Sequence, residues 1–97
     1  MVEHMVIFKF NEAAKKEQKD QAIEKLHNLK HVISGIKDLQ CNYNFSTRNQ
    51  GYEIGLTVRF ENKSALDEYT PHPKHQEAVS YLKEIGMVDS LVVDFEI

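Results

Sequence analysis

The side chains best suited to chemistry lie in one short stretch, Tyr69-Thr70-Pro71-His72-Pro73-Lys74-His75. Histidine has an unperturbed pKa of about 6.5, so it can accept or release a proton near neutral pH. In an apolar cleft, His75 would take a proton from a carbon beside a carbonyl group, while the hydroxyl of Tyr69 donates a hydrogen bond to the developing oxyanion. We therefore predict Tyr69 and His75 as a catalytic acid/base pair. The structural alternative is that His75 bridges buried polar groups and Tyr69 packs in the core with its hydroxyl bonded.

Two prolines, the only ones in the chain, fix the backbone of this stretch. Pro71 and Pro73 flank His72, and each proline disfavours a helical conformation for the residue before it. Pro73 is suited to the first turn of a helix, and the spacing predicts a helix over residues 73–85 that Gly86 ends. The stretch is therefore expected to be a rigid elbow that opens into a helix.

Three histidines are candidates for a cleft beside that helix. His75 shares a helix face with four apolar residues and so points towards the interior; these are Ala78, Val79, Leu82 and Ile85. His4 lies on the same face of the first predicted strand as large apolar residues, and we expect His4 and His72 to contact a ligand. Together, His4, His72 and His75 would satisfy the three-ligand requirement of a catalytic zinc site. Pro73 opposes their convergence, so we predict no metal and no cofactor.

Composition limits the class of protein. The chain has 97 residues, enough for a single domain over residues 1–97 and too few for two separate cores. A net charge of −3 argues against nucleic-acid binding, which needs a concentrated basic face. No apolar run approaches the roughly 20 residues that a bilayer requires, so we expect no membrane partner. Cys41 is the only cysteine, which excludes an intrachain disulfide and makes a cytoplasmic location the expectation.

Periodicity predicts six main elements in the order strand, helix, strand, strand, helix, strand. Alternation of apolar residues predicts strands at 2–10, 39–45, 52–60 and 91–97, and three- and four-residue spacing predicts a helix at 15–33. Ser64 and Asp67 resemble a capping box for an additional short helix at 65–69. Gly55, in the middle of a strand, predicts a bulge or the close approach of another group. His27 and His31 lie four residues apart on the flank and polar side of the first helix, where structural or solvated roles are expected.

This order of elements is that of a ferredoxin-like α+β fold, with both helices on one face of a four-stranded antiparallel sheet. The uncovered face would be apolar as well, since Met5 and Ile7 lie opposite Val6, Phe8 and Phe10. Because an exposed apolar patch of that size is unusual on a monomer, we predict a homodimer in which two sheets pair into an α+β barrel. The alternative is a monomer whose open face binds a different protein.

Several segments resemble the stress-responsive A/B barrel (Dabb) family over essentially the whole chain. These are residues 3–10, Gly35-Ile36-Lys37-Asp38 and, most specifically, the Tyr-x-x-His-Pro-x-His element at 69–75. The resemblance implies a dimeric α+β barrel. One plant branch of the family comprises polyketide cyclases that use the tyrosine and the last histidine as an acid/base pair in an aldol condensation, which implies the same roles for Tyr69 and His75. Leu26 and Gln40 stand where those cyclases carry aromatic pocket residues, so a different substrate is implied.

Two main functions follow. The first is a stress-associated dimer that binds a small hydrophobic or carbonyl-containing molecule without turnover, since no nucleophile motif or phosphate loop is present. The second is a cofactor-independent cyclase, isomerase or lyase that uses Tyr69 and His75. A purely structural assembly module is a third and weaker candidate.

Overall fold

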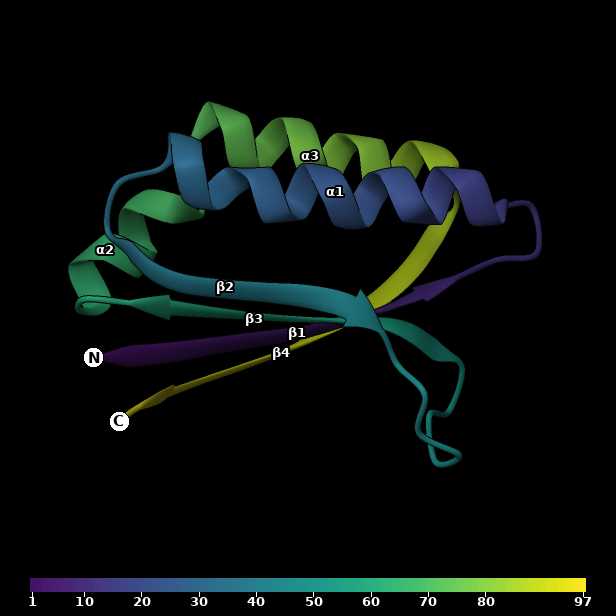
Figure 1. Cartoon of the computed structure of the whole chain (residues 1–97), viewed down its shortest axis with the longest axis horizontal. Coiled ribbons are helices and arrows are strands. Elements are labelled where there is room, and N and C mark those ends of the chain that lie inside the picture. The colour runs from purple at the N-terminus through teal and green to yellow at the C-terminus, as the bar shows by residue number, and fades with distance from the viewer.

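A four-stranded antiparallel sheet in the order β2-β3-β1-β4 forms one layer of the molecule (Figure 1). The computed structural model describes all residues, 1–97. The two central strands have large side chains on alternate positions, which is the pattern that favours a strand with one face packed on a core. The strands are β1 (Val2–Phe10), β2 (Ile36–Tyr43), β3 (Tyr52–Phe60) and β4 (Met87–Glu96).

Three helices form the second layer, and all of them lie on the same face of the sheet (Figure 1). They are α1 (Lys16–Val32), α2 (Lys63–Tyr69) and α3 (Pro73–Ile85). The long helices α1 and α3 pack side by side, while α2 lies at the end of the sheet where the chain termini are found. The predicted ferredoxin-like α+β fold is confirmed, and the opposite face of the sheet has no cover from its own chain.

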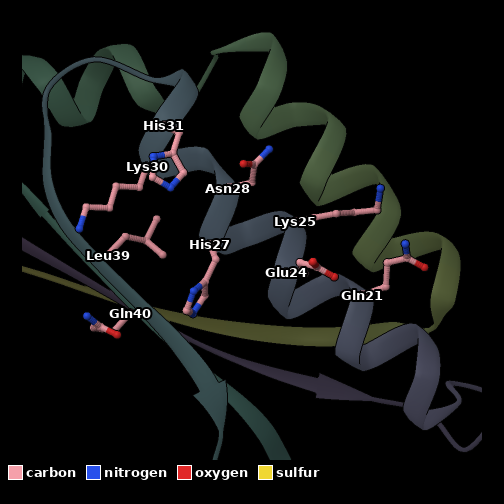
Figure 2. Close-up of a pocket in the computed structure, with 9 residues that line it drawn as sticks. All are labelled: Gln21, Glu24, Lys25, His27, Asn28, Lys30, His31, Leu39 and Gln40. Carbon is pink, nitrogen blue, oxygen red and sulfur yellow. The ribbon is translucent and has the colours of Figure 1, made fainter.

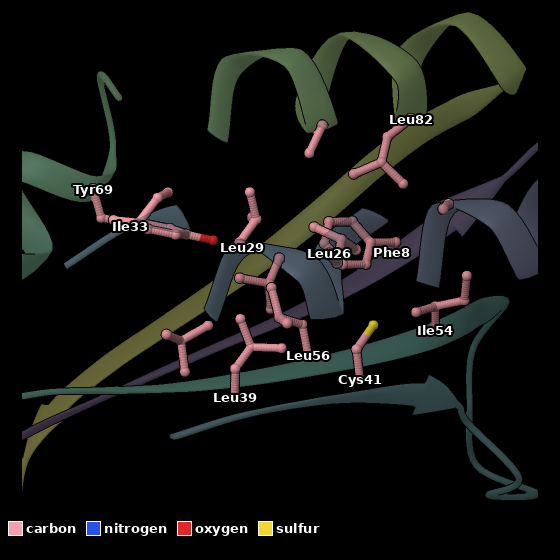
Figure 3. Packing of buried hydrophobic residues seen from close by; sticks show 14 of the residues in the cluster. Phe8, Leu26, Leu29, Ile33, Leu39, Cys41, Ile54, Leu56, Tyr69 and Leu82 are labelled. Carbon is pink, nitrogen blue, oxygen red and sulfur yellow. The ribbon is translucent and has the colours of Figure 1, made fainter. Parts of the chain in front are cut away.

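The core lies between the sheet and the two long helices (Figure 3). Leu26 and Leu29 of α1 and Leu82 of α3 approach from the helix layer, and Phe8 and Leu56 approach from the central strands. Residues on this face of β1 and β3 are nearly all buried, as the alternation predicts. His4 is the one polar side chain among the buried residues, with 9% of its surface exposed.

The ends of the two later helices follow from local chemistry. α3 begins at Pro73 and is ended by Gly86, as predicted, and Gly86 has a φ of 121°, a left-handed value that favours glycine. The side chain of His72 caps the helix, which was not predicted. The predicted short helix α2 is present and ends at Tyr69, but its predicted start and cap were wrong. The helix begins at Lys63, because the side chain of Asn62, and not that of Ser64, accepts the hydrogen bond that caps its first turn.

Three further expectations fail at the sheet. β2 covers Ile36–Tyr43 and not the predicted residues 39–45, so Phe45 lies beyond the strand. β4 begins at Met87, four residues before the predicted start, because its first residues pair with β1 without an alternation of buried and exposed side chains. Gly55 is not in a bulge: it pairs in regular register with Ile7 and Asn42. A Cβ atom at position 55 would meet nothing within 4 Å, so no group of the same chain requires a glycine there.

The uncovered face carries apolar side chains along one half. Cross-strand pairs place Phe95, Val93 and Leu91 of β4 beside β1, and all three are about half exposed, at 46%, 55% and 50%. Met5 of β1 is 39% exposed on the same face. None of the helices is long and apolar enough to cross a membrane.

Candidate functional site

A cleft of about 400 Å³ opens between the β1–β4 side of the sheet and helices α2 and α3. This volume is within the range of small-molecule sites, which begins at about 300 Å³. Its apolar wall comes from six elements, and its polar groups come from the end of α2, the start of α3 and the strands β1 and β4. The lining residues are His4, Val6, Phe8, Leu26, Leu56, Leu66, Asp67, Tyr69, Thr70, His75, Val79, Leu82, Met87, Ser90, Val92 and Asp94.

Tyr69, the last residue of α2, is buried with only 1% of its surface exposed. Its ring contacts the edges of Phe60 and His4, with centroids 5.0 and 5.8 Å away. The hydroxyl points into the core cluster (Figure 3), where no protein group forms a hydrogen bond with it. Burial, and secondarily the nearby thiol of Cys41, raises the pKa of this hydroxyl above its ordinary value, so it stays protonated as a hydrogen-bond donor.

His75 lies against Tyr69, with ring centroids 4.2 Å apart and planes inclined at 39°. Its Nδ1 is 2.9 Å from the carbonyl oxygen of Thr70, which the elbow turns towards it. Because a carbonyl only accepts, Nδ1 carries the proton and the lone pair is on Nε2. Burial lowers the pKa of His75, and the electrostatic influence of the neighbouring His4 and His72 rings adds to this effect, while the hydrogen bond to Thr70 opposes it in part. His75 is therefore held as a neutral base.

His4 completes the polar group of the cleft from the sheet side. Its Nδ1 is 2.5 Å from Oδ1 of Asp94, which lies directly across on β4. This carboxylate accepts a hydrogen bond from the Nδ1–H group of His4 and so fixes the orientation of the imidazole ring. Sequence analysis missed Asp94, because the pairing joins two residues that are 90 positions apart.

His72 has a different place from the other two histidines. Its Nδ1 accepts a hydrogen bond from the backbone N–H of Lys74 at 3.1 Å and thereby caps α3. It does not line the cleft. No group of three or more His, Cys, Asp or Glu side chains is arranged to hold a metal ion.

A second depression, of about 630 Å³, lies along α1 beside the edge strand β2 (Figure 2). It contains His27, His31 and Gln40, and Leu39 is its only apolar residue. The Nε2 atom of His27 is 2.7 Å from the carbonyl oxygen and 3.1 Å from the amide nitrogen of Cys41, so this imidazole covers the outer edge of β2. A polar groove without an apolar wall offers little to a small organic ligand. We therefore take the cleft as the candidate site.

The structure thus brings together three of the four residues that the sequence singled out. Tyr69, His75 and His4 meet at one end of an apolar cleft, and the side chain of His72 caps the start of α3 beside it. Leu26 lines the cleft as well, while Gln40 lies in the polar groove. An arrangement with one buried hydroxyl donor and one neutral imidazole acceptor can bind a carbonyl group and remove a proton beside it.

Comparison with known proteins agrees with this fold. The family model described as the stress responsive A/B barrel domain matches residues 2–97. The stress-response A/B barrel domain-containing protein HS1 of Arabidopsis thaliana is 30% identical over 98% of this chain and 88% of its own length. Olivetolic acid cyclase of Cannabis sativa is 28% identical over 76% of this chain and 75% of its own length. A dimeric ferredoxin-like protein of unknown function from Jannaschia sp. is 27% identical, covers 99% of this chain and 98% of its own, and has a TM-score of 0.82.

Proposed function

This chain belongs to the stress responsive A/B barrel domain family, and on that premise we propose that it binds a small hydrophobic molecule carrying a carbonyl group in the cleft between α3 and strands β1 and β4. The observation that carries the proposal is the hydroxyl of Tyr69: the residue lines an apolar cleft, and its hydroxyl is buried beside that cleft, on the core side, without a hydrogen-bond partner. A buried donor of this kind is costly when it is unpaired, and a ligand carbonyl would satisfy it. A role under stress rests on the family description alone.

The charges around the cleft favour a neutral ligand. No lysine or arginine lines it, and Asp67 and Asp94 do. A carboxylate ligand would lose its hydration there without gaining a fixed positive partner, which is unfavourable. A ketone or aldehyde needs only the one hydrogen bond that Tyr69 offers.

Calorimetric titration with three probes of similar shape tests this proposal: 2-acetylnaphthalene, 2-naphthoate and naphthalene. We expect the ketone to bind most tightly, and Tyr69→Phe to weaken its binding by up to about tenfold, the value of one net hydrogen bond. Naphthalene should bind the variant and the parent protein equally. Tyr52→Phe is the matched control, since that hydroxyl donates to Asp89 outside the cleft. If none of the three probes binds, or if the ketone binds Tyr69→Phe as tightly as the parent protein, the proposal fails.

A second candidate function is cofactor-independent enolisation of the bound carbonyl compound. The contact between the His75 and Tyr69 rings favours it, and a relative 28% identical is named as a cyclase. In such a step the Nε2 atom of His75 takes a proton from the carbon beside the carbonyl. The C–H electron pair forms the enolate, whose oxygen accepts the hydrogen bond from Tyr69.

Exchange of the methyl-ketone protons of 2-acetylnaphthalene in D₂O, followed by NMR, tests the second function without knowledge of the natural substrate. We expect exchange above the buffer rate, reduced roughly 10²- to 10⁴-fold in His75→Ala. His31→Ala, on the exposed side of α1, is the control and should exchange as the parent does. Equal exchange by His75→Ala and the parent would exclude His75 as the base.

We also propose that two copies pair through the uncovered sheet face. Three observations support this: the apolar stripe of Leu91, Val93 and Phe95, the pairing of charges on the same face, and the dimeric relative from Jannaschia. Glu3 binds Arg59 at 2.9 Å, so an identical face meets no uncompensated charge there. Val93→Lys should be a monomer in sedimentation equilibrium, whereas Val32→Lys, on the helix layer, should stay dimeric. The proposal is contradicted if both variants are monomers or if both are dimers.

The cytoplasm is the compartment that we propose, since a single buried cysteine needs no oxidising environment. Cell fractionation that recovers the protein in an oxidising compartment would contradict this assignment.

A further inference from the structure

The loop between β2 and β3 extends away from the body of the molecule on the side opposite the helices (Figure 1). This is the side of the uncovered sheet face. Phe45 lies in this loop with 99% of its surface exposed, while the next most exposed large apolar side chain, that of Val88, is 58% exposed. An aromatic ring wholly in water is among the costliest apolar exposures that a chain can make.

The loop is held in place by its own hydrogen bonds. The side chain of Asn44 accepts from the amide of Ser46 at 3.0 Å, and that of Asn49 accepts from the amide of Gly51 at 2.7 Å. Gly51 has a φ of 89°, which suits a glycine in the turn back into β3. Phe45 is thus presented outward by an ordered loop and cannot turn back into its own core without breaking these bonds.

We propose that Phe45 crosses the dimer interface and packs against the second copy of this chain. This inference rests on the proposed pairing of the two sheet faces. Because the loop leaves the sheet on the side where the partner would lie, a two-fold axis sends one Phe45 from each copy onto the other. The loop carries one charge, on Arg48, so its chemistry suits an apolar protein surface rather than a phosphate backbone.

The absence of tryptophan from the sequence gives a direct measurement. Phe45→Trp introduces the only indole, whose emission moves to shorter wavelength when it leaves water. We expect a blue-shifted emission in the dimer and a water-exposed emission in the Phe45→Trp/Val93→Lys double variant, which should be monomeric. Val32→Trp, at a 44% exposed position on the helix layer, is the matched control and should keep one emission maximum in both states.

Removal of the ring gives a second and independent measurement. Phe45→Ser should raise the dimer dissociation constant roughly tenfold or more, since each dimer loses two buried rings. Its thermal unfolding as a monomer in the Val93→Lys background should not change, because Phe45 has no buried contacts within its own chain.

The possible outcomes separate this inference from the proposal on which it rests. If Phe45→Ser dimerises like the parent and the indole at position 45 stays water-exposed in the dimer, the inference is overturned and the sheet-face dimer stands. If the parent protein is a monomer at all concentrations, both are overturned. An indole emission that shifts only on addition of phosphatidylcholine vesicles would assign Phe45 to a lipid surface and overturn the inference as well.

Discussion

Replacement of Tyr69 by phenylalanine should make the ligand-free protein more stable, whereas loss of a buried tyrosine hydroxyl ordinarily costs stability. The hydroxyl is buried with no hydrogen-bond partner, so the free energy lost when it leaves water is not offset by a hydrogen bond in the folded state. Phenylalanine keeps the ring and therefore keeps the contacts with Phe60, His4 and His75. Only the unpaired oxygen is lost.

The magnitude follows from the cost of an unpaired buried polar group, about 1–3 kcal/mol. The small void left by the oxygen offsets part of this gain, so a net stabilisation of about 1 kcal/mol is expected. For a domain of 60–100 residues this corresponds to a rise in Tm of about 4–8 °C. Differential scanning calorimetry at one fixed protein concentration measures it, since the proposed dimerisation would make Tm depend on concentration.

Tyr52→Phe is the control, because its hydroxyl donates to Asp89 at 2.7 Å and its loss should lower Tm. The reasoning is refuted if Tyr69→Phe lowers Tm as the control does, since the hydroxyl would then have a partner such as an ordered water in the cleft. The combination of higher stability and weaker ketone binding is what distinguishes a ligand-binding hydroxyl from a structural one.

Three further predictions concern groups around this site and the helix layer. His75→Gln should lose less stability than the parent protein when the pH is lowered from about 7.5 to about 5, as measured by urea unfolding. Folding lowers the pKa of His75, so the unfolded chain binds the proton more readily than the folded protein does. The stability of the parent therefore decreases as the pH is lowered through and below the ordinary pKa near 6.5. Asn62→Ala should cost about 1 kcal/mol by loss of the α2 cap, whereas Ser64→Ala should cost much less. His27→Ala should lower Tm by about 4–8 °C, because it uncovers the backbone of Cys41 at the edge of β2 and removes about 1 kcal/mol of hydrogen bonding.

Local patterns were enough to predict the parts of the fold with two distinguishable faces. The bounds of β1 and β3 agree with the predictions because buried and exposed side chains alternate along both strands. The bounds of α3 agree because Pro73 and Gly86 mark its ends. β4 was predicted too short, since nearly all of its side chains are exposed, on both faces of the strand. Buried and exposed residues therefore do not alternate along it, and its first residues carry no strand pattern. The proposed pairing of two sheet faces would cover the apolar residues Leu91, Val93 and Phe95 of β4.

The site was predictable in part, for a similar reason. His4, Tyr69 and His75 could be selected by residue type and by the helix or strand face on which they lie. Asp94 could not, since its role depends on the register between the first and last strands, and register is set by turns and by the packing of the whole sheet. The missing hydrogen bond of Tyr69 also cannot be predicted from the sequence, because it depends on the absence of a suitable polar atom in all the elements packed around the hydroxyl.

The elbow between α2 and α3 is what brings the rings of Tyr69 and His75 together. Tyr69 and His75 are six residues apart, and on one continuous helix their side chains would point about 120° apart and lie about 9 Å from each other along the axis. Instead, the chain turns after Tyr69, whose carbonyl oxygen accepts the N–H of His72 at 3.1 Å, and a new helix begins at Pro73. The turn brings the rings to 4.2 Å and places the carbonyl oxygen of Thr70 where it binds Nδ1 of His75. The prolines thus set both the distance between the two groups and the nitrogen on which His75 can accept a proton.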